Sequence, residues 1–432
     1  MPRRLILVVL KSAMAPKIAQ PMKLPHEIQL PEGVPAHDPP ALELDVTRAR
    51  RETPGCEHVA HFNNAGAALM PEPVVEAVIG HLRLESQIGG YEAATRAEAA
   101  VGGVYAAAGR LLNADISEIA IVDNATRAWT AAFYALPLKE GDRILTGASE
   151  YVSNYLAFLQ VTKRTGAVVE AVPSDESGQI SVDALADVID DRTKLIAITH
   201  VPTNGGLVNP AAAIGKVAAQ AGVPYLLDAC QSVGQMPIDV QVIGCDILSA
   251  TGRKFLRGPR GTGVLYMRRG LAEQLEPTVI DLGSADWVEK DRYEIRPGAK
   301  RFELWESYMA GKSGLRVAMD YARSWGLDIS YARIQKLADQ IRTGLGDIPG
   351  ATVHDLGVEQ CGIVSFVLDG RDPSDVTKAL RDQNVNVSVS TADMTRLDMD
   401  PRGLDSLIRA SVHYYNSDDE ISRLLEVLEH PE

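Results

Sequence analysis

Two ionisable side chains stand at the ends of apolar runs. Asp228 ends the run Tyr225–Asp228, and Lys254 follows the run Ile247–Ser249 inside a glycine-rich, basic stretch. A carboxylate at the end of so apolar a run is costly to bury unless a cation or strong donor faces it, and a pyridinium N–H is such a donor. A buried lysine beside Arg253 has a lowered pKa, so it can attack an aldehyde and hold it as a Schiff base. The plainer alternatives are a helix N-cap and a surface lysine.

A possible anion site follows the first apolar run, Ile119–Val122. The segment Asp123-Asn-Ala-Thr-Arg127 places small and hydroxyl residues where a helix is expected to begin. Free N–H groups and the helix dipole favour phosphate at such a position, although Thr126 could be a simple N-cap. Arg253 also suits a phosphate dianion.

The elements that position these residues are short apolar runs alternating with helical patterns. Runs of this length, bounded by turn residues, predict strands buried on both faces, and their alternation with helices predicts a mostly parallel sheet covered by helices. The carboxyl ends of such strands form one edge, where α/β proteins bind ligands. The seven runs are Ile119–Val122, Asp142–Leu145, Val168–Val172, Leu195–Thr199, Tyr225–Asp228, Ile247–Ser249 and Gly263–Tyr266.

The chain divides into three parts. Residues 1–55 are proline-rich and predict a flexible N-terminal arm; residues 56–310 form a large domain, and residues 311–432 a smaller C-terminal α/β domain. In the last part we expect helices over 311–325, 330–345 and 374–383 and from Asp418, with strands at 362–368, 385–389 and 408–412.

Composition excludes several classes of function. The formal charge of −14 over 432 residues argues against binding to nucleic acid or to an anionic membrane. No apolar run reaches the roughly 20 residues of a membrane span, and Leu5–Leu10 is too short for a signal peptide. The four cysteines are too scattered for a disulfide framework or metal site, so we expect a cytoplasmic protein without a metal.

The chain resembles the class V aminotransferases, fold type I enzymes that depend on pyridoxal 5′-phosphate (PLP) and include cysteine desulfurases, isopenicillin N epimerase-like proteins and carbon–sulfur lyases. The resemblance runs from about Phe62 to the C-terminus and lies in the order of eight short segments. These are Phe62-Asn-Asn-Ala-Gly66, Asn124-Ala-Thr126, Glu150-Tyr151, His200-Val-Pro-Thr-Asn204, Asp228-Ala-Cys-Gln231, Thr251-Gly-Arg-Lys254, Arg301-Phe-Glu303 and Arg409-Ala-Ser411.

The resemblance implies a role for each matching residue. Lys254 would carry the cofactor and move the proton at the substrate Cα, and Asp228 would keep the pyridine nitrogen protonated. Gln231 and Asn204 would lie near the ring hydroxyl, and Tyr151 would stack on the ring. Arg409 would grip the substrate carboxylate, with Asn64 and Tyr91 also facing the substrate. The phosphate would be held by Ala125, Thr126, Thr251 and Arg253.

The reaction is less determined than the cofactor. Desulfurases carry a nucleophilic cysteine on a loop before the carboxylate-binding arginine, but Ser388–Met394 contains none, and Cys361 reads as a core residue. We therefore expect β-elimination from a cysteine derivative, as in a C–S lyase, with transamination or epimerisation as alternatives. A PLP-binding regulatory protein without turnover is an alternative of another class.

The resemblance also implies a homodimer with its site at the interface. Desulfurases touch the phosphate across the dimer with a hydroxyl residue, where this chain has Glu306. We hypothesise that Glu306 pairs with Arg253 of the other subunit.

Overall fold

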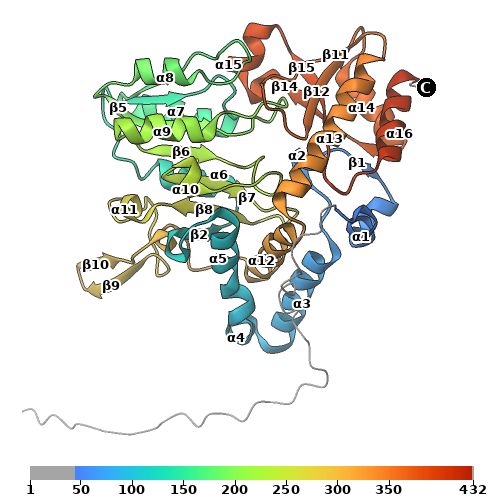
Figure 1. Ribbon diagram of the computed structural model, residues 1–432. Coiled ribbons are helices and arrows are strands. Elements are labelled where there is room, and N and C mark those ends of the chain that lie inside the picture. The colour runs from blue at the N-terminus through green and yellow to red at the C-terminus, as the bar shows by residue number, and fades with distance from the viewer. Residues whose placement is uncertain (1–43, 431–432) are drawn as a thin grey trace, which may run out of the picture.

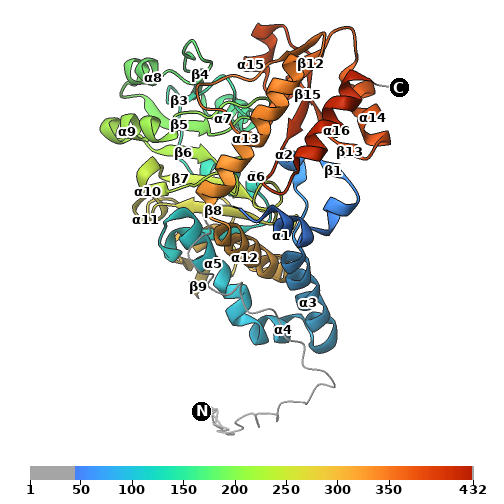
Figure 2. The ribbon, with the colours of Figure 1, turned by 45° about the vertical axis from the view of Figure 1, so that its right-hand side comes forward.

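The computed structural model describes residues 44–430, which form two packed α/β units (Figures 1 and 2). The larger unit is built on a seven-stranded sheet in the order β2-β8-β7-β6-β5-β3-β4. Only β8 runs antiparallel to its neighbours, so the mostly parallel α/β sheet expected from the sequence is confirmed. The strands are β2 (Ile119–Val122), β3 (Arg143–Thr146), β4 (Val168–Ala171), β5 (Thr193–Thr199), β6 (Tyr225–Asp228), β7 (Ile247–Thr251) and β8 (Gly263–Met267).

Successive side chains of the central strands enter opposite hydrophobic cores. Leu227 packs with the helices α5 and α9, whereas Leu226 packs with α6 and α7 on the other face. This alternation explains why the central runs are apolar throughout. The edge strand β4 is the exception: its residues are exposed or half-buried, so the prediction of burial on both faces is wrong there. The helices of this unit are α2 (Asn64–Ala67), α3 (Glu72–Ile88), α4 (Gly90–Arg96), α5 (Glu98–Leu112), α6 (Ala125–Phe133), α7 (Val152–Thr165), α8 (Val182–Val188), α9 (Ala211–Ala221), α10 (Val240–Ile243), α11 (Arg269–Ala272) and α12 (Met309–Ser324).

The smaller unit has an antiparallel sheet in the order β11-β12-β15-β14, covered by α13, α14 and α16. The N-terminal strand β1 pairs in parallel with β13 beside it. The elements are β1 (Ala60–His61), β11 (Ala351–Val353), β12 (Ile363–Leu368), β13 (Val385–Asn386), β14 (Ser388–Thr391), β15 (Ser406–Ser411), α13 (Leu327–Gly346), α14 (Pro373–Asp382), α15 (Arg396–Met399) and α16 (Asp418–Glu429).

Three features differ from the sequence expectations. The arm predicted over 1–55 does not extend through its last residues, because α1 (Val46–Arg51) packs on the smaller unit with Ala49 fully buried; residues 1–43 lie outside the described part. Most of the buried apolar residues of α12 pack on the larger unit, so a boundary near residue 325 fits the cores better than one at 310. The hairpin β9 (Ala285–Glu289) and β10 (Arg292–Ile295) was not expected.

Within residues 44–430, no helix combines the length and the apolar character needed to cross a lipid bilayer.

Candidate active site

A cavity of about 300 Å³ lies at the carboxyl ends of the central strands. Asp123 follows β2, Thr199 ends β5, Asp228 ends β6 and Thr251 ends β7, and all four line it. This is the sheet edge at which the sequence predicts a ligand. The lining residues are Asp123, Asn124, Ala125, Thr126, Tyr151, Asn154, Thr199, Val201, Thr203, Asp228, Cys230, Gln231, Thr251, Arg253, Lys254, Arg260, Gly261 and Thr262.

Lys254 extends into this cavity from the turn after β7. Burial lowers the pKa of its amine to about 8, and the positive charge of Arg253 acts in the same direction. Its Nζ lies 5.9 Å from the centroid of the Tyr151 ring. A sizeable fraction of the amine is therefore neutral near neutral pH, which is the form that attacks an aldehyde.

Asp228 is 5% exposed and faces the same cavity. Its Oδ2 accepts a hydrogen bond from Asn154 Nδ2 at 2.8 Å, and its Oδ1 accepts one from the backbone N–H of Cys230 at 2.9 Å. Among the described side chains, no lysine or arginine nitrogen lies within 4.0 Å of this carboxylate. Two neutral donors orient the charge without neutralising it, which leaves it able to hold a further cationic donor such as a pyridinium N–H.

The start of α6 forms the anion-binding end of the cavity. The Asn124 side chain accepts from the Arg127 N–H and caps the helix, while Ala125 and Thr126 occupy its first two positions, where N–H groups have no partner within the helix. Arg253 Nη1 lies 3.2 Å from Thr251 Oγ1. Arg260 also lines the cavity and was missed by the sequence reasoning, although it lies in the basic Gly-Pro-Arg-Gly turn.

Arg409 comes from β15 and is not among the residues that line the cavity, but it is hydrogen-bonded to Thr203, which is. Its Nη1 donates to the backbone oxygen of Thr203 at 3.0 Å and to Thr203 Oγ1 at 2.6 Å, and its Nη2 donates to Asn63 Oδ1 at 3.3 Å. The side chain is buried, its Nε has no hydrogen-bond partner among residues 44–430, and burial lowers the pKa of the guanidinium to about 10. A buried guanidinium with only neutral partners is suited to an anionic ligand.

The sequence suggested Asn204 near the ring hydroxyl of the cofactor, but Thr203, and not Asn204, is among the residues that line the cavity. Asn204 turns away from the cavity and donates to Thr395 Oγ1 at 2.8 Å, whereas Thr203 lines the cavity and lies 3.4 Å from Gln231 Nε2. The two are neighbours in an irregular loop after β5, so their side chains point in different directions. The family pattern predicts that this loop lies at the site, but it does not predict which side chain of the loop faces the cavity.

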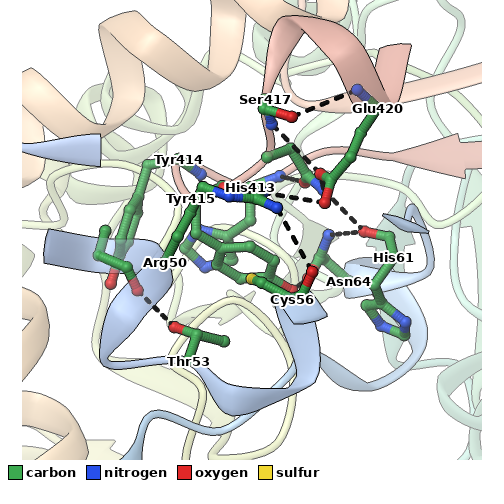
Figure 3. A network of polar contacts seen from close by, with 12 residues as sticks. Arg50, Thr53, Cys56, His61, Asn64, His413, Tyr414, Tyr415, Ser417 and Glu420 are labelled. Carbon is green, nitrogen blue, oxygen red and sulfur yellow. Dashed lines mark hydrogen bonds and ion pairs between the residues drawn. The ribbon is translucent and has the colours of Figure 1, made fainter. Parts of the chain in front are cut away.

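Asn64 is likewise a structural residue. Its Nδ2 donates to the backbone oxygens of His61 and Ser411, and its Oδ1 accepts from the Tyr415 hydroxyl, as part of the network in Figure 3. Both ends of its amide are thus used to join the N-terminal segment to β15. The prediction that Asn64 faces substrate is wrong; its neighbour Asn63 is the residue that contacts Arg409.

Tyr91 is not brought to the cavity. It lies on α4 and is 69% exposed, and it is absent from the residues that line the site. A role at the active site would require a second chain.

The arrangement fits PLP. An amine with a lowered pKa, a buried carboxylate without a cation and a helix N-terminus with two arginines occupy one cavity. Gln231 Oε1, which is buried and has no hydrogen-bond partner in the described part of the chain, supplies a further acceptor beside them. The aldehyde, ring nitrogen and phosphate of the cofactor each have a matching group here.

Comparisons with known proteins agree with this fit. The aminotransferase class-V family model matches residues 60–424. A probable cysteine desulfurase of Methanothermobacter thermautotrophicus is 30% identical over 389 residues, which cover 88% of this chain and 96% of that protein. The apo structure of a cysteine desulfurase from Thermococcus onnurineus NA1 superimposes with a TM-score of 0.83 at 27% identity, covering 90% of this chain and 98% of that one. The cystine C–S lyase C-DES, in complex with cysteine persulfide, shares the fold, with a TM-score of 0.79 at 24% identity over 88% of this chain and 99% of that one.

Proposed function

Because the chain belongs to the aminotransferase class-V family of PLP-dependent enzymes, we propose that it cleaves the carbon–sulfur bond of a cysteine derivative by β-elimination. The observation that carries this proposal is the cavity that joins Lys254, Asp228 and the neighbourhood of Arg409. Lys254 can bind the cofactor covalently, Asp228 can accept a hydrogen bond from the protonated ring nitrogen, and Arg409 can bind the α-carboxylate of the substrate.

Each of these residues has a distinct task. When bound, the cofactor supplies an electron sink that stabilises negative charge at the substrate Cα. Asp228 holds the proton of the ring nitrogen, and Arg409 binds the substrate carboxylate and so fixes the Cα above Lys254. Lys254 would hold the cofactor and would take the Cα proton of the substrate, since the lowered pKa of its amine leaves it partly neutral near neutral pH.

The positions of the cysteines favour carbon–sulfur cleavage without a persulfide on an enzyme cysteine. The relative from Methanothermobacter thermautotrophicus is named as a probable cysteine desulfurase, but Ser388–Met394 of this chain forms β14 and a short 3-10 helix and contains no cysteine. Cys361 is fully buried, and burial raises the pKa of its thiol to about 12. Cys230 does line the cavity, yet burial and the nearby Asp228 raise the pKa of its thiol well above the usual range, so it is not a thiolate nucleophile.

We further propose that two copies of the chain form the working enzyme. The loop that carries Trp305 and Tyr308 leaves both aromatic side chains partly exposed, at 49% and 38%. Tyr308 also lies beside Gly261, which lines the cavity: a Cβ added at that glycine would be 3.5 Å from Tyr308 Cδ1. Exposed aromatic side chains beside a site suit a subunit interface, and Glu306 would then pair with Arg253 of the second chain. Unchanged dimer mass and PLP affinity in Glu306→Gln would refute that pairing.

We also propose a cytoplasmic location, because the four cysteines are unpaired in the described part and their spacing suits no disulfide framework.

The test is a product assay on the PLP-loaded protein. Cystine and S-substituted cysteines should each yield pyruvate, ammonia and a sulfur-containing leaving group in equal amounts, and Lys254→Ala should yield none. Transfer of the amino group to a 2-oxo acid without sulfur release would support the aminotransferase alternative, and loss of optical activity without either product would support an epimerase. A visible absorbance band that borohydride removes, without turnover of any of these amino acids, would favour the regulatory alternative.

A further inference from the structure

Glu150 lies at the end of the turn that follows β3 and is not among the residues that line the cavity. It is 4% exposed, and among residues 44–430 no cation lies within 4.0 Å of its carboxylate. Five hydrogen-bond donors surround it instead: Thr146 Oγ1, the Tyr151 N–H, Asn154 Nδ2, the Thr199 N–H and Thr199 Oγ1. Three of the five can only donate, so the site is built for an acceptor.

Asn154 connects this carboxylate to Asp228. Its single NH₂ group donates to Glu150 Oε1 at 2.8 Å and to Asp228 Oδ2 at 2.8 Å. An amide that faces two carboxylates in this way cannot rotate by half a turn, because its oxygen would then face both acceptors. Glu150 thereby fixes the rotamer of Asn154, and Asn154 fixes one oxygen of Asp228.

We propose that Glu150 is a positioning residue for the cofactor, acting through Asn154 to hold the Asp228 carboxylate toward the ring nitrogen. The inference rests on the role proposed above for Asp228. It adds a residue that does not touch the cofactor and that the sequence reasoning passed over in favour of its neighbour Tyr151.

The cost of burying Glu150 supports a functional reason for its presence. Burial, together with the nearby charge of Asp228, raises the pKa of Glu150 to about 7 in spite of the hydrogen bonds from Thr199 and Asn154. A glutamine in this place would turn its NH₂ group toward donors, so the five donors require a carboxylate, and one of these donors is the amide that also holds Asp228.

The experiment is a double-mutant cycle on the affinity for PLP. Glu150→Gln keeps the shape of the side chain and removes its charge, and Asn154→Ala removes the connecting amide. We expect Asn154→Ala to weaken PLP binding about tenfold, because it takes a hydrogen bond from a charged group, and Glu150→Gln to weaken it about threefold. In the Asn154→Ala background, Glu150→Gln should change the affinity by less than about 1.5-fold, since the connection is already lost. Glu176→Gln, at an exposed position, is the matched control for charge removal and should leave the affinity unchanged.

Two outcomes would overturn the proposal. One is an equal effect of Glu150→Gln with and without Asn154, and the other is wild-type PLP affinity in Asn154→Ala. The second comparison needs only Asn154→Ala and thus holds even if Glu150→Gln does not fold. Failure of the wild-type protein to form a borohydride-sensitive visible band would instead refute the cofactor role of Asp228 itself, so the two failures are distinguishable.

Discussion

Replacing Arg409 by methionine should stabilise the protein and at the same time abolish amino-acid binding. Arg409 is 8% exposed, and its hydrogen-bond partners Thr203 and Asn63 are neutral. A buried charge with only neutral partners lowers the free energy of unfolding. A role in binding an anionic ligand would explain why the charge is present in spite of this cost. Methionine has a similar length and carries no charge.

The size of the effect follows from the pKa of the guanidinium. Burial lowers that pKa from 12.5 to about 10, and each unit corresponds to about 1.4 kcal/mol, so the charged form is destabilised by about 3.5 kcal/mol. Because the folded-state pKa is the lower one, this cost is present at every pH below about 10 and declines only as the pH rises from there. Losing the hydrogen bonds to Thr203 and Asn63 offsets about 2 kcal/mol. We therefore expect a net gain of about 1.5 kcal/mol in the free energy of unfolding at neutral pH.

Urea unfolding and spectral titration of the PLP-loaded protein would measure both effects. The unfolding midpoint should rise in Arg409→Met, and the amino-acid affinity, followed by the change in visible absorbance, should fall by about 100-fold or more. Arg409→Lys is the control, since it keeps the charge and should give no gain in stability. If Arg409→Met instead lowered the free energy of unfolding by more than about 1 kcal/mol while Arg409→Lys left it unchanged, the charge of Arg409 would stabilise the fold, and the reasoning would be refuted.

Three further predictions concern the cavity. Since burial lowers the pKa of Lys254 to about 8, the rate at which apoprotein recombines with PLP should rise with pH and level off above about 8; a midpoint near 10.5 would contradict a buried amine. Thr203→Val removes the hydroxyl 2.6 Å from Arg409 and should weaken amino-acid binding about fivefold in the same spectral titration, with unchanged PLP affinity. Gly263→Ala would place a Cβ 2.5 Å from the backbone carbon of Asn124, so it should displace the start of α6 and lower PLP affinity at least about tenfold, whereas Gly270→Ala, with open space around it, should not; equal affinities would refute the close packing.

The sequence by itself determined the sheet and the meeting of the main reactive groups. Apolar runs bounded by turns specify strands such as β6 and β7, because only buried strands accommodate side chains that are apolar on both faces. Because parallel strands end at one edge of the sheet, the sequence alone predicts that Asp228 and Lys254 lie near each other, and both line the cavity.

Only the tertiary structure decided which side chains of the loops face the cavity. A shift of one residue in an irregular loop redirects a side chain. Thr203 lines the cavity where the sequence suggested Asn204 near the ring hydroxyl, and Asn63 contacts Arg409 where it suggested Asn64 toward the substrate. No periodicity constrains such loops, and their conformation is fixed by contacts with distant segments.

The same reason explains the other differences. Helix α1 is only six residues long and is stabilised by packing on the smaller unit, which its proline-rich surroundings do not reveal. The link from Glu150 through Asn154 to Asp228 joins the ends of β3 and β6 across the sheet edge. Two carboxylates distant in sequence share one amide only once β3 and β6 lie in one sheet, with β5 between them.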